Sequence, residues 1–457
     1  MLAIGRDARE RSGTAPVGTG LASSLAAALG FVFTVASFFP GYMSPDSVSQ
    51  LSQGRAMRFT DWHPPVMSFL WGVIDRVVPG PAGMLVLHNV MFWVGLSLFV
   101  YHLGFERAWA ATAILLTGLF PPVLALLSTI WKDVGMVCSF MLACGLLLRA
   151  ERTGSRLAWV MALIPLWYGF TTRHNAIIAA VPLTMWAALI SRSLFQRERG
   201  DPRWSAILRA CLLVILLAAT SAGANRLLTR SGSSLAVQQI LIHDLVAVSL
   251  ETNEVHLPDY LIEALGSRKV ADLKPLYTPN EIVPLFCCDS GHRRLPLISD
   301  SATFSSLWAE WRSTIPRHLG AYIKHRARVF ESQMAIGRPT VCTPFWDGIQ
   351  PSSLNLTFRP TALNRWVMDL LSSVKNGPLF RGWLYLVLLM GLIGVCWLGS
   401  ARDRVAALLI GLSGLLYALS YFFVSTTCDF RMHWWTVVTV FLLVLMTIAG
   451  RLNSARP

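Results

Sequence analysis

The strongest constraint on the fold is a series of apolar segments, each close to the ~20 residues that an α-helix needs to cross a bilayer. Such segments recur along most of the chain of 457 residues. They lie at about 20–39, 83–103, 107–128, 134–149, 157–172, 174–191, 206–228, 378–399, 404–424 and 433–450. The sequence therefore predicts a mainly α, polytopic membrane protein with about ten transmembrane helices.

The composition excludes an ordinary soluble enzyme. Only 14% of the residues are charged and the mean hydropathy is +0.52, whereas soluble domains carry about 25% charged residues. The formal net charge is +14. In a membrane protein a basic balance reflects orientation and contact with anionic lipid, so we expect membrane lipids, and not nucleic acid, among the partners.

Two regions interrupt the simple pattern of spans. The segment from Pro64 to Val78 is short and contains Asp75 and Arg76, so we expect an interfacial or re-entrant helix there. The region 157–191 contains either two short spans or one long helix. Two spans are favoured, because a single one would place the Arg-rich loop that follows on the wrong side of the membrane.

The basic residues of the short loops predict the orientation, because cytoplasmic loops retain Lys and Arg. With ten spans and a cytoplasmic N-terminus, all of these loops lie inside. We therefore expect a multi-pass protein of the cytoplasmic (inner) membrane with both termini in the cytoplasm. The residues concerned are Arg6, Arg9, Arg11, Arg149, Arg152, Arg156, Arg192, Arg197, Arg199, Arg203, Arg209, Arg402, Arg404, Arg451 and Arg456.

Three regions follow from this topology. Residues 1–228 form an N-terminal transmembrane module whose first external loop is 40–82, and residues 378–457 form a C-terminal one. The hydrophilic stretch 229–377 between them is long enough for an external (periplasmic) soluble domain. In its second half, apolar residues at helical spacing predict a basic amphipathic helix around 319–330.

Eight cysteines do not define a disulfide framework. Four lie in apolar segments, where a thiol behaves as a small hydrophobic group. The other four lie in external segments, so one disulfide is expected in an oxidising compartment, although the spacing leaves its pairing open. These four are Cys287, Cys288, Cys342 and Cys428.

Four external connections carry ionisable residues at helix ends, where desolvation costs several kcal/mol unless the groups are paired. Their convergence at one membrane face predicts a functional site. The candidate catalytic residues are Asp46, Asp61 and His63. The candidate substrate- and phosphate-binding residues are Lys132, Asp133, Arg173, His174, Arg431 and His433.

Each of these residues also has a purely structural interpretation. Asp46 could form an Asx-turn or cap a helix. The adjacent Lys132 and Asp133 could form a charge pair at a helix start, or Asp133 could be an N-cap. The histidines could be hydrogen-bonded packing residues: His63, His174 and His433. Arg173 could extend to lipid headgroups. Asp429 and Arg431, two residues apart, could form a local ion pair.

The combination of residues favours glycosyl transfer from a lipid phosphate. A carboxylate can accept the proton of an attacking hydroxyl, and cations can hold a phosphate leaving group as its charge grows. Arg presents a planar fork that matches phosphate oxygens, and Lys presents a point charge. Lys132, Arg173 and Arg431 are therefore the predicted phosphate-binding residues.

Short motifs add a family resemblance. Asp-Trp-His-Pro-Pro (61–65), Trp-Lys-Asp-Val (131–134), Arg-His-Asn (173–175) and Asp-Phe-Arg-Met-His (429–433) resemble a group of bacterial membrane proteins of the GT-C superfamily. That superfamily comprises polyprenyl-phosphosugar glycosyltransferases with many spans and an external soluble part. The resemblance implies a GT-C-like fold and a catalytic base in the first external loop, which corresponds to Asp46.

One departure from the superfamily pattern bears on the mechanism. The usual pair of adjacent acids is missing, because Asp46 is flanked by Pro45 and Ser47. This departure leaves both a single-acid mechanism and the need for a divalent metal open. Asp61 with His63 could supply a second acid or metal ligands, or could shape the start of the helix at Pro64.

The predicted function is that of a membrane-embedded inverting glycosyltransferase. It would transfer a sugar from a polyprenyl-phosphate donor to a lipid or glycan acceptor at the outer face of the membrane. One alternative is a polymerase or ligase of lipid-diphosphate-linked polysaccharide. A second alternative is a transporter or flippase of lipid-linked sugars, against which the absence of two repeated halves argues.

Overall fold

The computed structural model describes residues 18–195, 204–229, 235–286, 294–337, 342–398 and 403–454. Within these ranges the chain forms helices and loops, with three isolated β-bridges. The prediction of a mainly α protein is thus confirmed.

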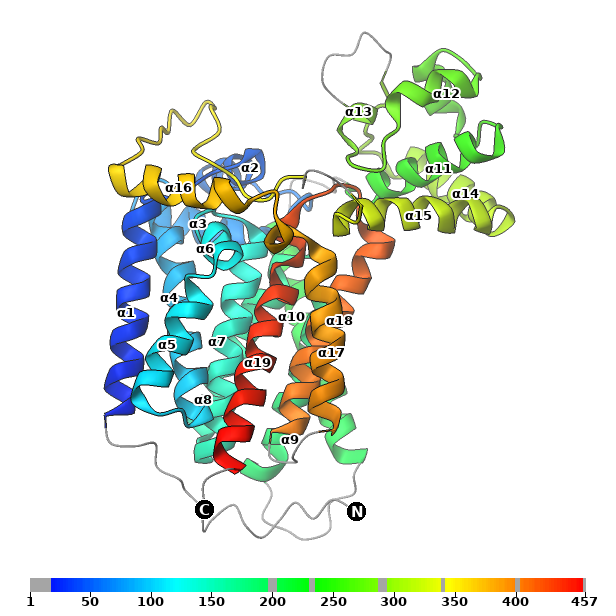
Figure 1. The fold of residues 1–457 in the computed structure, drawn as a ribbon. Coiled ribbons are helices and arrows are strands. Elements are labelled where there is room, and N and C mark those ends of the chain that lie inside the picture. Colours follow the sequence, from blue (N-terminus) through cyan, green and yellow to red (C-terminus); the bar gives the residue numbers. More distant parts are fainter. Residues whose placement is uncertain are drawn as a thin grey trace.

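A bundle of helices that lie side by side forms the body of the molecule (Figure 1). α7 is its centre, because it packs against α4, α8, α9 and α19 and is the most deeply buried of the apolar helices. α10 and α17 expose apolar side chains outward, as lipid-facing helices do. The bundle consists of α1 (Thr19–Phe38), α4 (Ala82–Leu103), α5 (Arg107–Gly118), α6 (Pro121–Leu127), α7 (Lys132–Thr153), α8 (Arg156–Thr172), α9 (Ala176–Phe195), α10 (Trp204–Leu228), α17 (Gly382–Leu398), α18 (Arg404–Val424) and α19 (Trp434–Ser454).

Several of these helices are long and apolar enough to cross a membrane, as expected for a polytopic membrane protein. Seven meet that criterion among the described residues: α1, α4, α7, α9, α10, α18 and α19. α5 and α6 add an eighth if they form one span with a 64° bend. α8 and α17 have only 17 residues each, so the total of ten spans stays a prediction.

The region 157–191 forms two antiparallel helices. The indole Nε1 of Trp159, near the start of α8, donates to the carbonyl of Ala187, near the end of α9, at 2.8 Å. Between the helices Arg173 has extended backbone, with φ −140° and ψ 145°. This hairpin rules out one continuous helix and places the Arg173 turn at the end of the bundle.

The first loop contains two short helices, α2 (Pro45–Ala56) and α3 (Pro65–Asp75). The latter is the short helix expected between Pro64 and Val78. The two helices pack through Gly54 and Gly72, where a Cβ on either residue would overlap the backbone of the other. An ion pair of 2.8 Å between Arg55 and Asp75 joins their ends. The loop is therefore a folded unit that can hold Asp46 in place.

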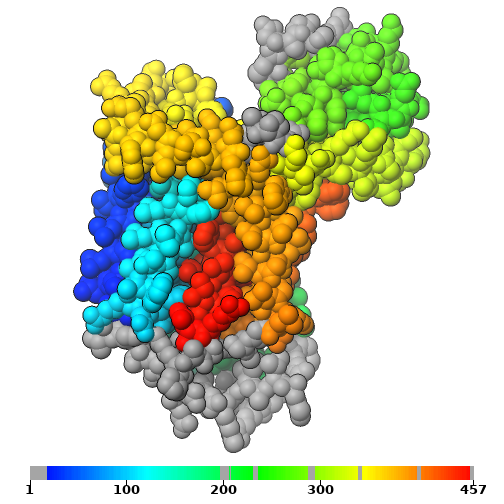
Figure 2. All heavy atoms as spheres, viewed as in Figure 1, coloured from blue at the N-terminus to red at the C-terminus, as the bar shows by residue number. Residues whose placement is uncertain are grey.

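A second helical unit stands out from the same end of the bundle (Figure 2). It has its own apolar core, which includes Leu241, Leu245, Leu261 and Leu307. The unit comprises α11 (Gln238–Thr252), α12 (Asp259–Leu265), η1 (Val270–Leu276), α13 (Val283–Phe286), α14 (Ser301–Arg317) and α15 (Leu319–Met334). α15 is the helix that the apolar spacing around 319–330 predicts.

A buried ionic network fixes α15 to its surroundings. Asp244 of α11 lies 2.6 Å from Arg326 and 3.2 Å from His325, and none of the three side chains is exposed. Arg326 also donates to the carbonyl of Ser425, just after α18, at 2.9 Å. Because buried charges are costly unless paired, this network links the helical unit firmly to the loop before α19.

The chain after Cys342 returns over the bundle. Met43 and Gly348 share a backbone hydrogen bond of 2.9 Å, and Asn364 donates to the Tyr42 hydroxyl at 2.6 Å. α16 (Ala362–Val374) lies across the end of α1 (Figure 1). The predicted external region 229–377 therefore divides into the helical unit and a second segment that packs on the first loop. This covering segment runs from Cys342 through α16.

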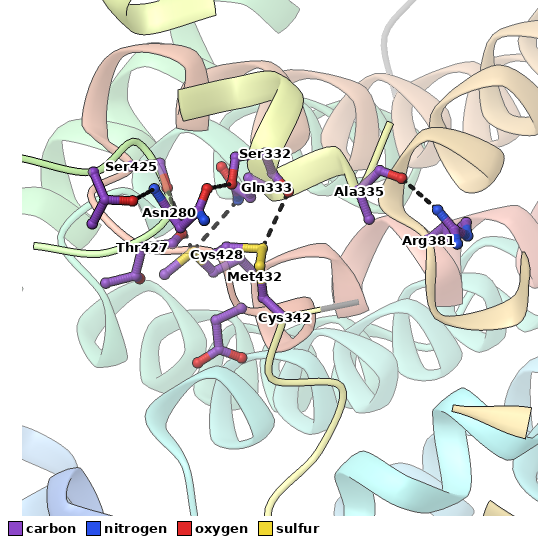
Figure 3. Close-up of a disulfide and its surroundings, with 12 residues drawn as sticks. Asn280, Ser332, Gln333, Ala335, Cys342, Arg381, Ser425, Thr427, Cys428 and Met432 are labelled. Carbon is purple, nitrogen blue, oxygen red and sulfur yellow. Dashed lines mark hydrogen bonds between the residues drawn. A yellow bond between two sulfur atoms is a disulfide. The ribbon is translucent and has the colours of Figure 1, made fainter. Parts of the chain in front are cut away.

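A disulfide joins Cys342 to Cys428 (Figure 3). It bridges the start of the covering segment and the loop before α19, where Phe430 also donates its N–H to the Thr343 carbonyl at 3.0 Å. A disulfide between two of the four external cysteines is thus present, and the structure supplies its pairing. Cys287 and Cys288 lie outside the described residues.

Removal of this disulfide is expected to destabilise the loop before α19. The bond closes a loop with a sequence separation of 86 residues, for which chain entropy gives a stabilisation of about 4.6 kcal/mol. Cys342→Ser is expected to lower the melting temperature of the detergent-solubilised protein by several degrees. Cys211→Ser, which removes an exposed free thiol, is the control. Equal melting temperatures for the two variants would contradict this assignment.

Candidate functional site

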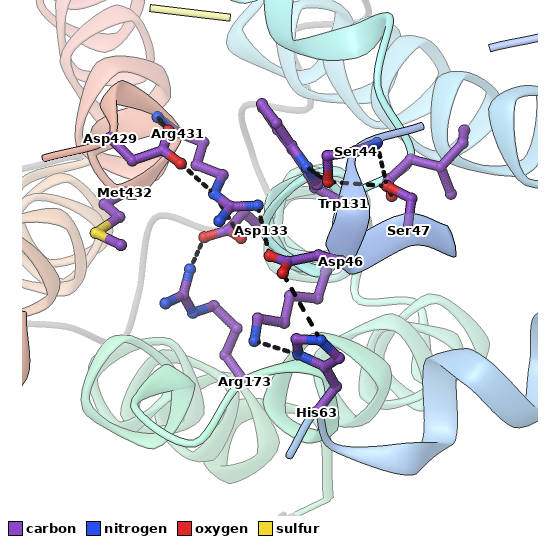
Figure 4. Close-up of polar contacts among 12 residues, drawn as sticks. Ser44, Asp46, Ser47, His63, Trp131, Asp133, Arg173, Asp429, Arg431 and Met432 are labelled. Atoms are coloured by element: carbon purple, nitrogen blue, oxygen red, sulfur yellow. Dashed lines mark hydrogen bonds and ion pairs between the residues drawn. The ribbon is translucent and has the colours of Figure 1, made fainter. Parts of the chain in front are cut away.

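The four predicted connections meet at one end of the bundle and form a compact charged cluster (Figure 4). The first loop contributes to it, as do the start of α7, the turn after α8 and the loop before α19. Six of the nine candidate residues belong to it, and one residue outside that set, Asp429, joins them. The charged cluster consists of Asp46, His63, Lys132, Asp133, Arg173, Asp429 and Arg431.

Ser44 and Ser47, and not the Asp46 carboxylate, form the cap of α2, so that this carboxylate can contact the charged cluster. Ser44 is the N-cap of α2, and its N–H donates to Ser47 Oγ at 3.1 Å. Trp131 Nε1 donates to Ser44 Oγ at 2.7 Å, and Ser47 Oγ donates to the Ile130 carbonyl at 2.8 Å. These bonds clamp the first turn of α2 to the segment that begins α7.

Arg431 is the centre of the cluster. Its Nη1 lies 3.0 Å from Asp46 Oδ2, and its Nε lies 2.8 Å from Asp429 Oδ2. Asp133 Oδ2 is farther away, at 3.9 Å from Nε. The guanidinium also lies over the Trp131 ring, 4.6 Å from its centroid, which favours a cation. One arginine is therefore shared by three carboxylates.

Asp133 pairs with arginines and not with the adjacent lysine. Arg173 forms a close ion pair with Asp133 Oδ1 and also lies over the Tyr421 ring. The Asp133 side chain is only 1% exposed, whereas that of Asp46 is 32% exposed. Of these two carboxylates, Asp46 is the one that an incoming molecule can reach.

Lys132 is held by His63. Its Nζ donates to His63 Nδ1 at 2.8 Å. An ammonium group can only donate, so Nδ1 is the acceptor and Nε2 carries the ring proton. That Nε2 faces Asp46 Oδ1 at 3.8 Å. Burial and the nearby Lys132 charge lower the pKa of His63 to about 3, so its ring is neutral at physiological pH.

The carboxyl groups of Asp46 and Asp429 differ in their ionisation. Burial opposes ionisation of Asp46, but the positive charge of Arg431, with that of Lys132, outweighs it and holds the pKa of that carboxyl below its usual value. Burial raises the pKa of Asp429 above its ordinary value, although Arg431 opposes this shift. Asp46 is therefore the stronger candidate for a carboxylate that stays charged.

Three predicted residues lie outside the charged cluster. His433 Nε2 donates to the Gln333 carbonyl at 3.1 Å, and its ring packs against Gly382, so it joins α15 to α17. His174 Nε2 donates to the backbone carbonyl of Asp61 at 3.3 Å. Through this contact His174 and Asp61 connect the α8–α9 turn to the first loop beside Lys132.

Residues that the sequence did not single out as site residues complete the surroundings. Asp429 was expected only as a local partner of Arg431, and it does form that pair. Trp131 supplies the ring beneath the Arg431 guanidinium. Its place in the Trp-Lys-Asp motif was the only feature of the sequence that could have indicated a role in the site. Tyr421 lies within α18 with no neighbouring motif, so nothing in the sequence marked it.

Metal ligation stays a prediction. Among the described residues, no group of three or more His, Cys, Asp or Glu side chains is close enough to hold a metal ion. The carboxylates of the cluster instead face the guanidinium groups of Arg173 and Arg431. These arginines and Lys132 place positive charge where a phosphate would need it.

Comparison with known proteins adds no family assignment. No protein-family model matches the chain, and no curated protein matches it significantly. The functional interpretation therefore depends on the geometry and on the resemblance of the short motifs.

Two substitutions of His63 are expected to show that its hydrogen bond to Lys132, and not only its volume, supports binding of lipid phosphate. His63→Asn keeps an acceptor for the Lys132 ammonium, whereas His63→Leu leaves that buried charge without one. A hydrogen bond to a charged group contributes about 1.5–3 kcal/mol, so we expect binding of lipid phosphate to be at least ~10-fold weaker in the Leu variant than in the Asn variant. Titration of the purified variants with polyprenyl phosphate tests this. Equal affinities would contradict a role of His63 in positioning Lys132.

Proposed function

We propose that this protein is a membrane-embedded inverting glycosyltransferase that uses a polyprenyl-phosphate sugar. The observation that carries the proposal is the accessible carboxylate of Asp46, held 3.0 Å from Arg431 beside Lys132 and Arg173. A single accessible base among several cations fits a reaction that removes a proton from the acceptor and leaves a phosphate behind.

The proposed step is a direct displacement at the anomeric carbon. The acceptor hydroxyl attacks this carbon as Asp46 takes the hydroxyl proton. The bond between the anomeric carbon and the phosphate oxygen breaks, and its electron pair stays on polyprenyl phosphate. Because attack and departure occur on opposite faces of the sugar, the anomeric configuration inverts. Lys132, Arg173 and Arg431 stabilise the charge that grows on the leaving phosphate.

Binding of the donor would also activate Asp46. Without donor, three cations face three carboxylates in the cluster, and Arg431 lowers the pKa of Asp46. A phosphate competes for the same guanidinium, because Arg binds phosphate and carboxylate oxygens alike. As Arg431 turns toward the phosphate, the pKa of Asp46 rises and the carboxylate becomes a stronger base.

The distribution of charge supports a location at the external face of the cytoplasmic membrane. The charged cluster lies at one end of the bundle, and the opposite ends of the helices carry basic residues. Under the positive-inside rule those opposite ends are cytoplasmic. They include Arg149, Arg152, Arg156, Arg192, Arg404 and Arg451.

A donor comparison tests the proposal. Purified protein in lipid nanodiscs would receive either polyprenyl-monophosphate sugars or polyprenyl-diphosphate sugars with candidate acceptors. We expect release of polyprenyl phosphate and a product of inverted anomeric configuration with the monophosphate donors only. Turnover of diphosphate donors alone would instead identify a polymerase or ligase. Sugar translocation without a glycosylated product would identify a transporter.

A further inference from the structure

The helical unit contains a cavity that lies apart from the charged cluster. Its volume is about 210 Å³, and α11, η1 and α15 form its walls. α11 packs against both η1 and α15, and α11 and α15 lie side by side in the ribbon view (Figure 1). The lining residues are Ala247, Leu250, Glu251, Lys274, Tyr277, His325 and Arg328.

On the polar side of this cavity, the hydroxyl oxygen of Tyr277 can accept a hydrogen bond. The Asp244 carboxylate lies 3.2 Å from His325 Nε2, and a carboxylate oxygen so close favours the ring proton on that nitrogen. Burial lowers the pKa of His325, so the ring is neutral and its Nδ1 is an acceptor. The Tyr277 hydroxyl, 2.9 Å away, therefore donates to Nδ1. Its own lone pairs are left for a donor inside the cavity, such as a sugar hydroxyl.

The opposite side of the cavity is cationic. Glu251 pairs with both Lys324 and Arg328, and Lys274 adds a further positive charge. The charged residues that line the cavity are the cations Lys274 and Arg328 and the carboxylate of Glu251, which leaves net positive charge. Lys274 forms no ion pair with another described residue, and its side chain is exposed. This side is suited to a negatively charged group.

The size of the cavity limits what can occupy it. Pockets that enclose drug-sized ligands measure about 300–1,000 Å³, so a cavity of 210 Å³ fits a smaller group. Ala247 and Leu250 supply an apolar wall beside the Tyr277 ring. One sugar ring with an apolar face, a hydroxyl and a single anionic substituent matches all of these features.

We propose that the cavity between α11, η1 and α15 is a binding site for one anionic sugar residue. Lys274 and Arg328 bind its carboxylate or phosphate, and the Tyr277 oxygen accepts a hydrogen bond from a ring hydroxyl. The site is formed within the helical unit and does not require that the charged cluster be catalytic.

Equilibrium binding to the full-length protein in nanodiscs tests this site. Glucuronate and glucose 6-phosphate are the anionic sugar probes and distinguish a carboxylate from a phosphate ligand. Glucose lacks the charge, and inorganic phosphate lacks the ring. We expect at least one anionic sugar to bind at least 10-fold more tightly than both glucose and inorganic phosphate. Higher salt should weaken this binding, since the cationic groups lie partly in solvent.

Two variants locate the binding. Lys274→Glu is expected to weaken the affinity for the anionic sugar at least 10-fold. Lys269→Glu makes the same charge change at an exposed position outside the cavity and should bind as the unaltered protein does. Tyr277→Phe should reduce the preference for the anionic sugar over inorganic phosphate. Asp46→Asn should leave all of these affinities unchanged, which separates this site from the proposed glycosyl transfer.

Three results would overturn the proposal. The first is inorganic phosphate binding as tightly as the anionic sugar that binds better. The second is a similar loss of affinity in Lys274→Glu and Lys269→Glu. The third is the absence of saturable binding of both anionic sugars by protein whose melting curve shows that it is folded.

Discussion

Replacement of Asp46 by Asn is expected to reduce sugar transfer by about 100- to 10,000-fold, the range that a general base contributes. The substitution keeps the size of the side chain and removes the atom that takes the acceptor proton. Because the capping bonds of α2 are made by Ser44 and Ser47, the first loop should stay folded. The readout is the initial rate of product formation, with the melting temperature as a check on folding.

Asp61→Asn is the matched control for this prediction. It makes the same chemical change in the same loop, but the contact that joins Asp61 to His174 uses the Asp61 backbone carbonyl. We expect this variant to keep most of the activity. Full activity in Asp46→Asn, or a greater loss in Asp61→Asn, would reject Asp46 as the base.

Arg431→Ala is expected to have the second large effect, on both donor binding and pH dependence. The guanidinium faces Asp46, Asp429 and, more distantly, Asp133. Loss of its charge-assisted bonds should weaken binding of polyprenyl phosphate by roughly 10- to 150-fold, which corresponds to about 1.5–3 kcal/mol. Arg431→Lys should restore only part of the affinity, because Lys lacks the planar fork.

The pH dependence of Arg431→Lys and Arg431→Ala follows from the ion pair with Asp46. Arg431 holds the pKa of Asp46 below its usual value, so the base is deprotonated even in mildly acidic solution. Without the guanidinium that pKa rises, and the acidic limb of the rate profile should move to higher pH, furthest in the Ala variant. Arg365→Ala, an exposed arginine on α16 at the same end of the bundle, is the control. An unchanged acidic limb together with an unchanged donor affinity would contradict this role of Arg431.

The convergence of the four loops was predictable because their polar residues occur at helix ends on the same side of alternating apolar segments. Asp46, Lys132 and Arg431 are far apart in sequence, and only their shared position relative to the spans indicated that they would meet. The short helix after Pro64 and the helix around 319–330 were predictable from prolines and apolar spacing. Their functional roles stay predictions.

The partners within the cluster were not predictable, because they depend on side-chain packing. Adjacency left open a pair between Lys132 and Asp133, yet Lys132 bonds His63 and Asp133 pairs with Arg173. His433 belongs to a charged motif, but the start of α19 turns its ring toward α15 and α17. Successive side chains on a helix point about 100° apart, so the motif alone could not show toward which helices the His433 ring points.

The division of the region 229–377 into two parts could not be predicted from the sequence either. No change in composition marks the point where the chain leaves the helical unit. The covering segment is held by contacts to residues some 300 positions away, such as the bond from Asn364 to Tyr42. The disulfide at Cys342 was one of several possible pairings for the same reason.

The most direct test of the account is the position of a bound lipid phosphate. A cryo-electron microscopy structure of the protein in nanodiscs with polyprenyl phosphate would show it. We expect the phosphate at the charged cluster, within hydrogen-bond distance of Lys132, Arg173 and Arg431, with Asp46 facing the side from which an acceptor arrives. A phosphate bound at the opposite end of the bundle, or away from all three cations, would contradict the account.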